Sequence, residues 1–144
     1  KLLAHCLQVS EAKVSSLEEE LDSTRQSVQS ESKSTAGDKH ETGRAMMHLE
    51  QEKLHQQLGE AKVVLAELQQ IKANHSNTVI GLGSLVTTNK GLFFFAAGLG
   101  KVDLDGQTVF VVSTKAPIAK QFVGKQIGEQ VNMNGTVYDI QVVQ

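Results

Sequence analysis

Two carboxylates stand three residues apart, at Asp38 and Glu41, directly after a glycine. As local structure, this spacing predicts a capping box at a helix start, where acids also interact favourably with the helix dipole. As chemistry, two carboxylates this close can share a hard divalent cation such as Mg²⁺. Lys33, Lys39 and Arg44 lie nearby in the chain, and their charges suit contact with a phosphodiester. Both interpretations are open at the level of these residues alone.

The composition limits what kind of protein can position such a group. The chain has 144 residues, of which 40% are hydrophobic and 21% charged, as in an ordinary globular protein of one or two small domains. The apolar runs are too short to span a membrane, and the one cysteine excludes an internal disulfide, so we expect a cytoplasmic protein. A net charge of -2 argues against a protein that finds free nucleic acid by electrostatic attraction.

Residues 1–73 are rich in helix formers and carry two heptad patterns. Antiparallel pairing of the two patterns places Leu7, Val14, Leu17, Leu21, Thr24 and Val28 opposite Leu68, Ala61, Leu58, Leu54, Gln51 and Met47. In every pair the two residue numbers have the same sum, so the mirror point lies between residues 37 and 38. The pattern predicts an antiparallel coiled-coil hairpin with its tip near 35–42. The acids would then stand at the end of a rod, where there is no core to protect.

Residues 79–144 change to strand and turn chemistry, after a polar linker at 74–78. "NKG", "DG" and "NG" predict tight turns, and "APIAKQFVGK" predicts a short helix with Pro117 first and Gly124 as its stop. We therefore expect an α+β protein, in which a helical hairpin precedes a small antiparallel sheet of about five strands with one short helix.

Three further groups contain residue types that could do chemistry: the run Phe93–Phe95, the helix-spaced His48, Glu52 and His55, and His5 beside Cys6. Neighbouring residues of a strand point to opposite faces, so the aromatic run predicts a strand covered on both sides rather than a stacking platform. The histidines lie outside the heptad seam and lack a third convergent ligand, which favours a solvated face over a metal site. His5 and Cys6 are interpreted as surface chemistry. No complete active site stands out.

The sequence resembles the bacterial transcript cleavage factors of the Gre type over nearly the whole chain. Two stretches carry the resemblance. "GDKHE" is similar to that family's Gly-Asp-x-x-Glu, which places its two essential acids on Asp38 and Glu41. "APIAKQFVGKQIGEQV" is similar to its most specific C-terminal motif, with matches at Pro117, Ile118, Gly124, Lys125, Gly128 and Val131. The resemblance implies an N-terminal antiparallel coiled coil followed by an FKBP-like domain.

The resemblance also implies a partner and an activity. The C-terminal domain would dock on RNA polymerase at the rim of the secondary channel, through Pro117, Ile118, Lys120, Gly124 and Lys125. The coiled coil would enter that channel, where the tip acids help to hold a second Mg²⁺ near the RNA 3′ end, with Lys33, Lys39 and Arg44 around them. The polymerase itself hydrolyses backtracked RNA. The chain would thus be a monomer that binds no cofactor alone and is not itself an enzyme.

Other functions stay open. The family usually continues Asn-Ala-Glu-Tyr after the second acid, whereas Thr42, Gly43, Arg44 and Ala45 follow here. This difference leaves open, as the alternative, a regulator or inhibitor that binds in the channel without stimulating cleavage. An FKBP-like fold also allows a prolyl isomerase or chaperone, although a chain with no Trp and one Tyr is poor in the aromatic residues that line such sites. A coiled-coil adaptor is a third class, in which the tip acids are inert.

Overall fold

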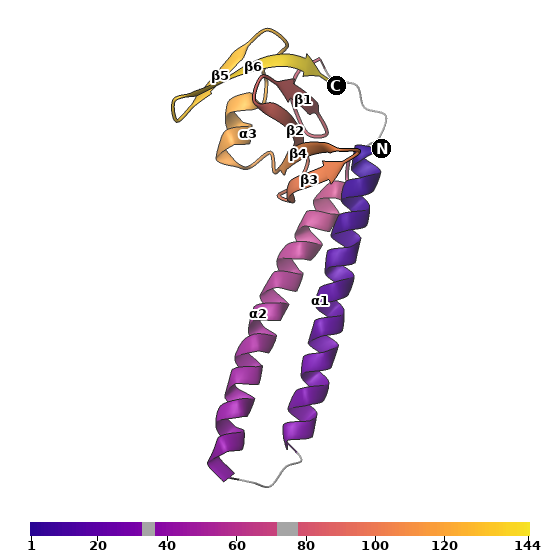
Figure 1. The fold of residues 1–144 in the computed structure, drawn as a ribbon, viewed down its shortest axis with the longest axis vertical. Helices are drawn as coiled ribbons and strands as arrows, with labels where there is room; N and C mark the ends of the chain where they lie inside the picture. The colour runs from indigo at the N-terminus through magenta and orange to yellow at the C-terminus, as the bar shows by residue number, and fades with distance from the viewer. Residues whose placement is uncertain (33–36, 72–77) are drawn as a thin grey trace. The chain divides into compact units, whose positions relative to one another are not determined.

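A computed structural model describes residues 1–32, 37–71 and 78–144, with side chains described outside 28–42. The elements follow the order α1 (Leu2–Ser32), α2 (Gly37–Gln69), β1 (Leu85–Thr88), β2 (Gly91–Phe95), β3 (Gly100–Leu104), β4 (Gln107–Val112), α3 (Pro117–Phe122), β5 (Gln130–Met133) and β6 (Thr136–Val143) (Figure 1). They form two compact units. The hairpin unit is residues 9–63, and the sheet unit is residues 1–8 with 64–144. No helix in the described ranges is long and apolar enough to cross a bilayer.

The hairpin unit consists of α1 from residue 9 onward and α2 up to residue 63, which run antiparallel and are held by one apolar seam. Its buried cluster is Leu17, Leu21, Leu54, Leu58 and Ala61, with Val14 packed against it. These are the heptad positions that the sequence predicts to face one another, so the hairpin and this part of its register are confirmed. The predicted partner at residue 28 has a side chain outside the described set. Away from the seam both helices are mostly polar, because a two-helix coil has only one covered stripe. The apolar exceptions that are exposed are Val9, Met46, Leu49 and Val63.

The sheet is built mainly from hairpins whose turns the sequence predicts. The β3–β4 and β5–β6 hairpins turn at Asp105–Gly106 and Asn134–Gly135, and all four of these residues have positive φ angles. This is the left-handed conformation that Asn-Gly and Asp-Gly adopt in two-residue turns. The strand order is β3-β4-β2-β1-β6-β5. The α+β class and the single short helix are therefore confirmed.

The expected number and direction of the strands need a correction. The sheet has six strands, and β2 pairs with β4 in parallel, with Phe93 beside Phe110. A tight turn makes β3 and β4 antiparallel to each other but does not decide which of them lies beside β2. β4 is the more apolar strand, with Val109 and Val111 buried, whereas β3 exposes Lys101 and Asp103. The charged strand therefore takes the sheet edge, which also discourages pairing with other chains.

Both faces of the sheet are covered, as the run of three phenylalanines predicts. Phe94 belongs to a cluster with Val102, Val109 and Val111 on one face. Phe93 and Phe95 belong to a second cluster on the other face, where α3 contributes Ala119 and Phe122. Because adjacent side chains of a strand alternate, one apolar run serves two cores. The prediction of a doubly covered strand is confirmed.

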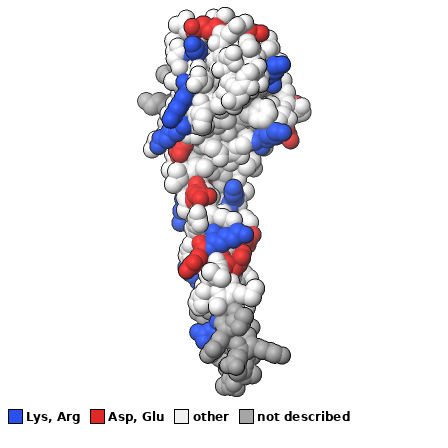
Figure 2. Space-filling view, turned by 90° about the vertical axis from the view of Figure 1, so that its left-hand side faces the viewer, with Lys and Arg blue, Asp and Glu red and all other residues white. Residues whose placement is uncertain are grey.

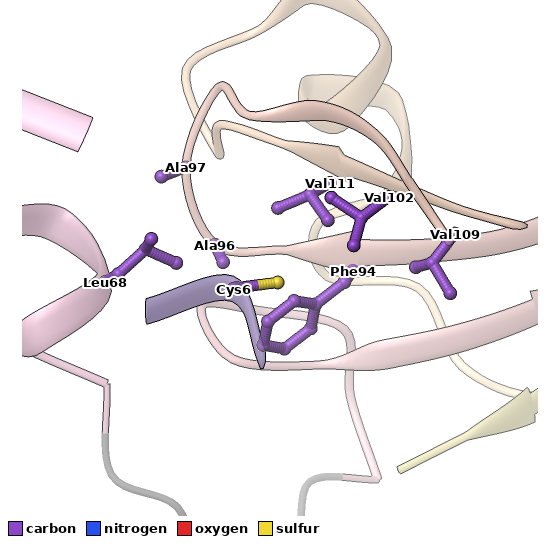
Figure 3. Packing of buried hydrophobic residues seen from close by; sticks show 8 residues of the cluster. All are labelled: Cys6, Leu68, Phe94, Ala96, Ala97, Val102, Val109 and Val111. Atoms are coloured by element: carbon purple, nitrogen blue, oxygen red, sulfur yellow. The ribbon is translucent and has the colours of Figure 1, made fainter. Parts of the chain in front are cut away.

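The expectation that Cys6 is surface chemistry is wrong. Its side chain is 0% exposed and packs in the first cluster with Leu68, Phe94 and Ala96 (Figure 3). Burial withholds solvent from the thiolate and raises the pKa of the Cys6 thiol to about 11. A helix position outside the heptad seam is buried here because the first turns of α1 belong to the sheet unit. These turns pack on the sheet as well as beside α2, so a wider stripe of α1 is buried here than in the hairpin unit.

Candidate functional site

The hairpin end carries the first candidate site. α2 begins at Gly37, so Asp38 and Glu41 both lie within its first five residues. Asp38 is thus inside the first turn and not the expected N-cap before it, a position where an acid still interacts favourably with the helix dipole. Residues three apart on a helix share a face, so positions 38 and 41 lie on one side of α2. The side chains of these two acids and of Lys39 lie outside the described set, and Lys33 falls outside the described residues altogether.

The described residues next to this end add an exposed base and an apolar pair. Arg44 is exposed, and it is the nearest described charged side chain to the two acids along α2. Met46 and Leu49 are also largely exposed, one helical turn apart. Sequence reasoning passed over this pair because it lies just outside the heptad seam. On the face that Figure 2 shows, acidic and basic side chains alternate along the hairpin unit, with no single-sign stripe.

The second candidate site is the C-terminal motif, which forms α3 and the segment after it. Pro117 is at the start of α3 and is exposed, while the helix turns Ala119 and Phe122 into the core. Gly124 follows the helix with a φ of 89°, in the left-handed region that glycine adopts without strain. Its role as helix stop is confirmed.

Backbone hydrogen bonds tie this segment to the rest of the sheet unit. The Gly124 N–H donates to the Ile80 carbonyl at 2.9 Å, and the Ile80 N–H donates to the Lys125 carbonyl at 2.9 Å. The Gln126 N–H donates to the Glu129 carboxylate at 2.6 Å. Gly128 also has a positive φ, and its N–H donates to the Ile140 carbonyl. Gly124 and Gly128 therefore both have a structural role in the motif. These hydrogen bonds hold residues 117–128, which we call the ledge, against the rest of the sheet unit.

The side chains that this ledge presents to solvent differ from the motif positions. Of the residues expected to bind a partner, Pro117 and Lys120 are exposed, while Ile118 and Lys125 are only partly so. The large apolar side chains that are exposed on this segment are Val123 and Ile127. Their signal in the sequence is weak, since a single exposed Val or Ile is common on protein surfaces.

Aromatic residues of the second core cluster pack against one another, with Phe93 at the centre of the group. Phe93 contacts Phe95, Phe110, Phe122 and Tyr138, with ring centroids 5.4–6.3 Å apart. Three of these rings, those of Phe93, Phe95 and Phe122, are buried. They pack against one another as core, which is the arrangement that offset and edge-on ring contacts favour.

The helix-spaced histidines remain separate from both candidate sites. His48, Glu52 and His55 are all exposed on α2. Among the residues that the structure describes, no group of three or more His, Cys, Asp or Glu side chains is placed to hold a metal ion.

Comparison with known proteins gives similarity in three-dimensional structure alone. No protein-family model matches the chain, and no curated protein matches it. A solved structure of the transcription factor Gfh1 matches 96% of this chain and 92% of its own, with 15% identity and a TM-score of 0.41. The GreA factor homologue Gfh1 of Thermus thermophilus matches 92% and 95%, with 16% identity and a TM-score of 0.36. Gfh1 of Thermus aquaticus matches 92% and 94%, with 15% identity and a TM-score of 0.32. The fold resembles theirs in outline.

Proposed function

We propose that this chain is a transcription factor that binds RNA polymerase and places the end of its hairpin in the secondary channel. The observation that carries the proposal is the position of Asp38 and Glu41, which share one side of α2 where the hairpin reverses. Farther along the hairpin unit from these two positions, the apolar seam with Leu21 and Leu54 holds the two helices together. A pair of acids at such an end has little value as core structure, but it suits delivery into the active site of another protein.

The chemistry follows from what two carboxylates can and cannot do. Mg²⁺ prefers several charged or neutral oxygen ligands in near-octahedral geometry, and two acids supply only part of that set. Asp38 and Glu41 fit as partial ligands, to be completed by the acids of the polymerase. The ion supplies charge stabilisation and water activation in phosphoryl chemistry. Under this proposal the two acids hold and orient, while the polymerase hydrolyses the RNA, so the chain is a stimulator and not an enzyme.

The sheet unit provides the docking surface under the same proposal. The ledge from α3 to Gly128 is held rigidly by hydrogen bonds to Ile80 and Ile140. It presents Pro117 and Lys120 to solvent. A rigid surface loses little conformational entropy on binding, which is a property that favours affinity. This is the segment whose sequence is similar to the C-terminal motif of the Gre-type factors.

The tip is tested with two charge-removing substitutions. Asp38→Asn and Glu41→Gln keep the approximate shape of each side chain and remove its charge. We expect unchanged binding to polymerase and about a 100-fold loss of RNA cleavage in a backtracked complex, the size typical of removing one electrostatic stabiliser. Raised Mg²⁺ should rescue part of the loss. Asp22→Asn, on the exposed part of α1, is the matched control and should change neither quantity.

Docking is tested on the whole chain, because an isolated fragment from residue 79 would lack Cys6 and Leu68, which cover one face of the sheet. Lys120→Glu should weaken binding to polymerase by about tenfold or more, as reversal of an interfacial charge does. Lys90→Glu reverses an exposed charge in the β1–β2 turn and is the control. Equal affinity of the wild type and both variants would remove the ledge from the interface and favour an adaptor that binds through its hairpin.

One observation favours a second version of this function. Arg44 is exposed near the two acids, where a base can pair with them or with a phosphate. A factor with this tip would occupy the channel and block nucleotide addition without stimulating cleavage. In that version the wild type inhibits RNA extension, shows no cleavage, and loses inhibition on Asp38→Asn. In that version Arg44→Glu would also relieve the inhibition. In the cleavage version Arg44→Glu leaves binding to polymerase unchanged.

A further inference from the structure

The sheet unit contains an open pocket that the proposed function does not use. Its volume is about 440 Å³, and every residue that lines it belongs to the sheet unit. The floor consists of two cross-strand pairs on one face of the sheet, Leu85 with Phe94 and Leu92 with Val109. The first turn of α1 contributes Leu2 as a wall. The pocket thus lies on the same face as Cys6, on the side away from α3.

Part of the lining consists of leucine side chains that the core covers only incompletely. Leu2, Leu85 and Leu92 are each only half-buried, although they pack against the buried cluster of this face. Several incompletely covered leucines around one hollow leave apolar area in contact with water, which costs free energy until something covers it. Pockets that bind small molecules have volumes of roughly 300–1,000 Å³ and combine apolar side chains with a small number of polar groups.

Volume and charge together select the class of occupant. One inserted side chain of a partner protein, even a large aromatic one, fills well under half of a pocket of about 440 Å³, whereas a small molecule of two or three rings fills most of it. The charged side chains at the mouth are those of Lys1 and Asp105, which form an ion pair with each other. Both side chains are largely exposed to solvent as well as paired, so neither is a buried charge that would select an anion or a cation strongly. Gln107 and Gln144 offer neutral hydrogen-bonding groups at the rim.

From these observations we infer that the pocket binds a small neutral apolar molecule with one hydrogen-bonding group at the mouth. The occupant contacts the start of α1 and strands β1, β2 and β4 at once, so binding stabilises the packing of the helix ends on the sheet. None of the residues that line the pocket belongs to the segment 117–128 or to positions 38 and 41. It gives the protein a place where a metabolite of that class acts on the stability of the sheet unit.

The test uses N-phenyl-1-naphthylamine, a neutral dye that fluoresces strongly in apolar surroundings, with the whole chain. We expect saturable binding of one dye per chain with half-saturation at roughly 100 µM or below, as expected for a ligand of this size. Two substitutions fill the pocket from different sides: Leu92→Phe on the floor and Gln107→Phe at the exposed rim. Val137→Phe adds the same ring at an exposed position of β6 that does not line the pocket.

Both filling variants should bind the dye at least about tenfold more weakly, because overfilling removes the space that the ligand needs. The Val137→Phe control should bind as the wild type does. Gln107 is exposed, so its substitution tests the site even if Leu92→Phe disturbs the fold, which circular dichroism will show. Absence of saturable binding overturns the inference. Equal binding by the wild type, Gln107→Phe and Val137→Phe places the dye elsewhere and overturns it too.

Discussion

Leu54→Ala is the sharpest test of the hairpin. Leu54 is 4% exposed and lies in the seam cluster with Leu17, Leu21 and Leu58. The substitution removes three carbon atoms from a buried position, and at about 0.8 kcal/mol for each the transfer loss is about 2.4 kcal/mol. A cavity adds to this loss in a closed core, but the seam of a two-helix coil is open at its sides and collapses more easily. We therefore expect the free energy of unfolding of the hairpin unit to fall by about 2–3 kcal/mol.

The control is a leucine on the same helix with the opposite environment. Leu49 is 65% exposed, so Leu49→Ala should change stability by less than about 0.5 kcal/mol. Urea unfolding is followed by circular dichroism at 222 nm, which reports mainly the helices. Fluorescence of Tyr138, the one tyrosine, reports the sheet unit separately. Equal losses for the two variants, or a loss below about 0.5 kcal/mol for Leu54→Ala, would refute the seam.

Three further predictions follow from the packing. In a Cys6→Ala background, cysteines at Leu21 and Leu54 should cross-link within one chain under mild oxidation, because the two positions share the seam cluster; disulfides found only between chains would contradict the antiparallel hairpin. The raised pKa of the Cys6 thiol means that above about pH 9 the unfolded chain loses this proton first, so folding stability should fall by about 2 kcal/mol as the pH rises from 9 to 11. Cys6→Ala should lack that part of the pH dependence in urea titrations, and an identical pH profile would show that the thiol is not shielded. Gly59→Ala should raise stability by about 0.5–1 kcal/mol, because Gly59 is inside α2 and nothing lies within 4 Å of an added methyl group; a lower unfolding midpoint would mean that the position is crowded.

The sequence by itself determined the features that depend on short-range periodicity and turn chemistry. A heptad repeat has one covered stripe, so the equal sums of the paired residue numbers were enough to place Leu21 and Leu54 in one seam. Asn134–Gly135 predicts a two-residue hairpin because few other pairs accept two left-handed conformations. The double coverage of Phe93–Phe95 followed from the alternation of side chains along a strand. Each of these rules acts within a few residues or within one helix pair.

For the two candidate sites as well, the sequence predicted some features and the tertiary structure decided others. The spacing of Asp38 and Glu41 was enough to place them on one side of a helix, whether or not that helix does chemistry. The motif after α3 was recognisable as a pattern, but its surface was not. Gly124 is needed for its positive φ, and Val123 and Ile127 are the apolar side chains that reach solvent. Which side of a turn faces water depends on hydrogen bonds to Ile80 and Ile140, and these residues are distant in the sequence.

Only the tertiary structure decided the features in which distant segments compete for the same neighbour. Cys6 is outside the heptad seam, yet it is buried because the sheet covers the side of α1 that a coiled coil leaves in water. β4, not β3, pairs with β2, because the more apolar strand gains more from the interior place and the charged strand loses less at the edge. The pocket exists because Leu2, Leu85 and Leu92 meet without filling the space between them. No local pattern encodes such a mismatch, since it depends on how the side chains of a helix and of two strands fit together.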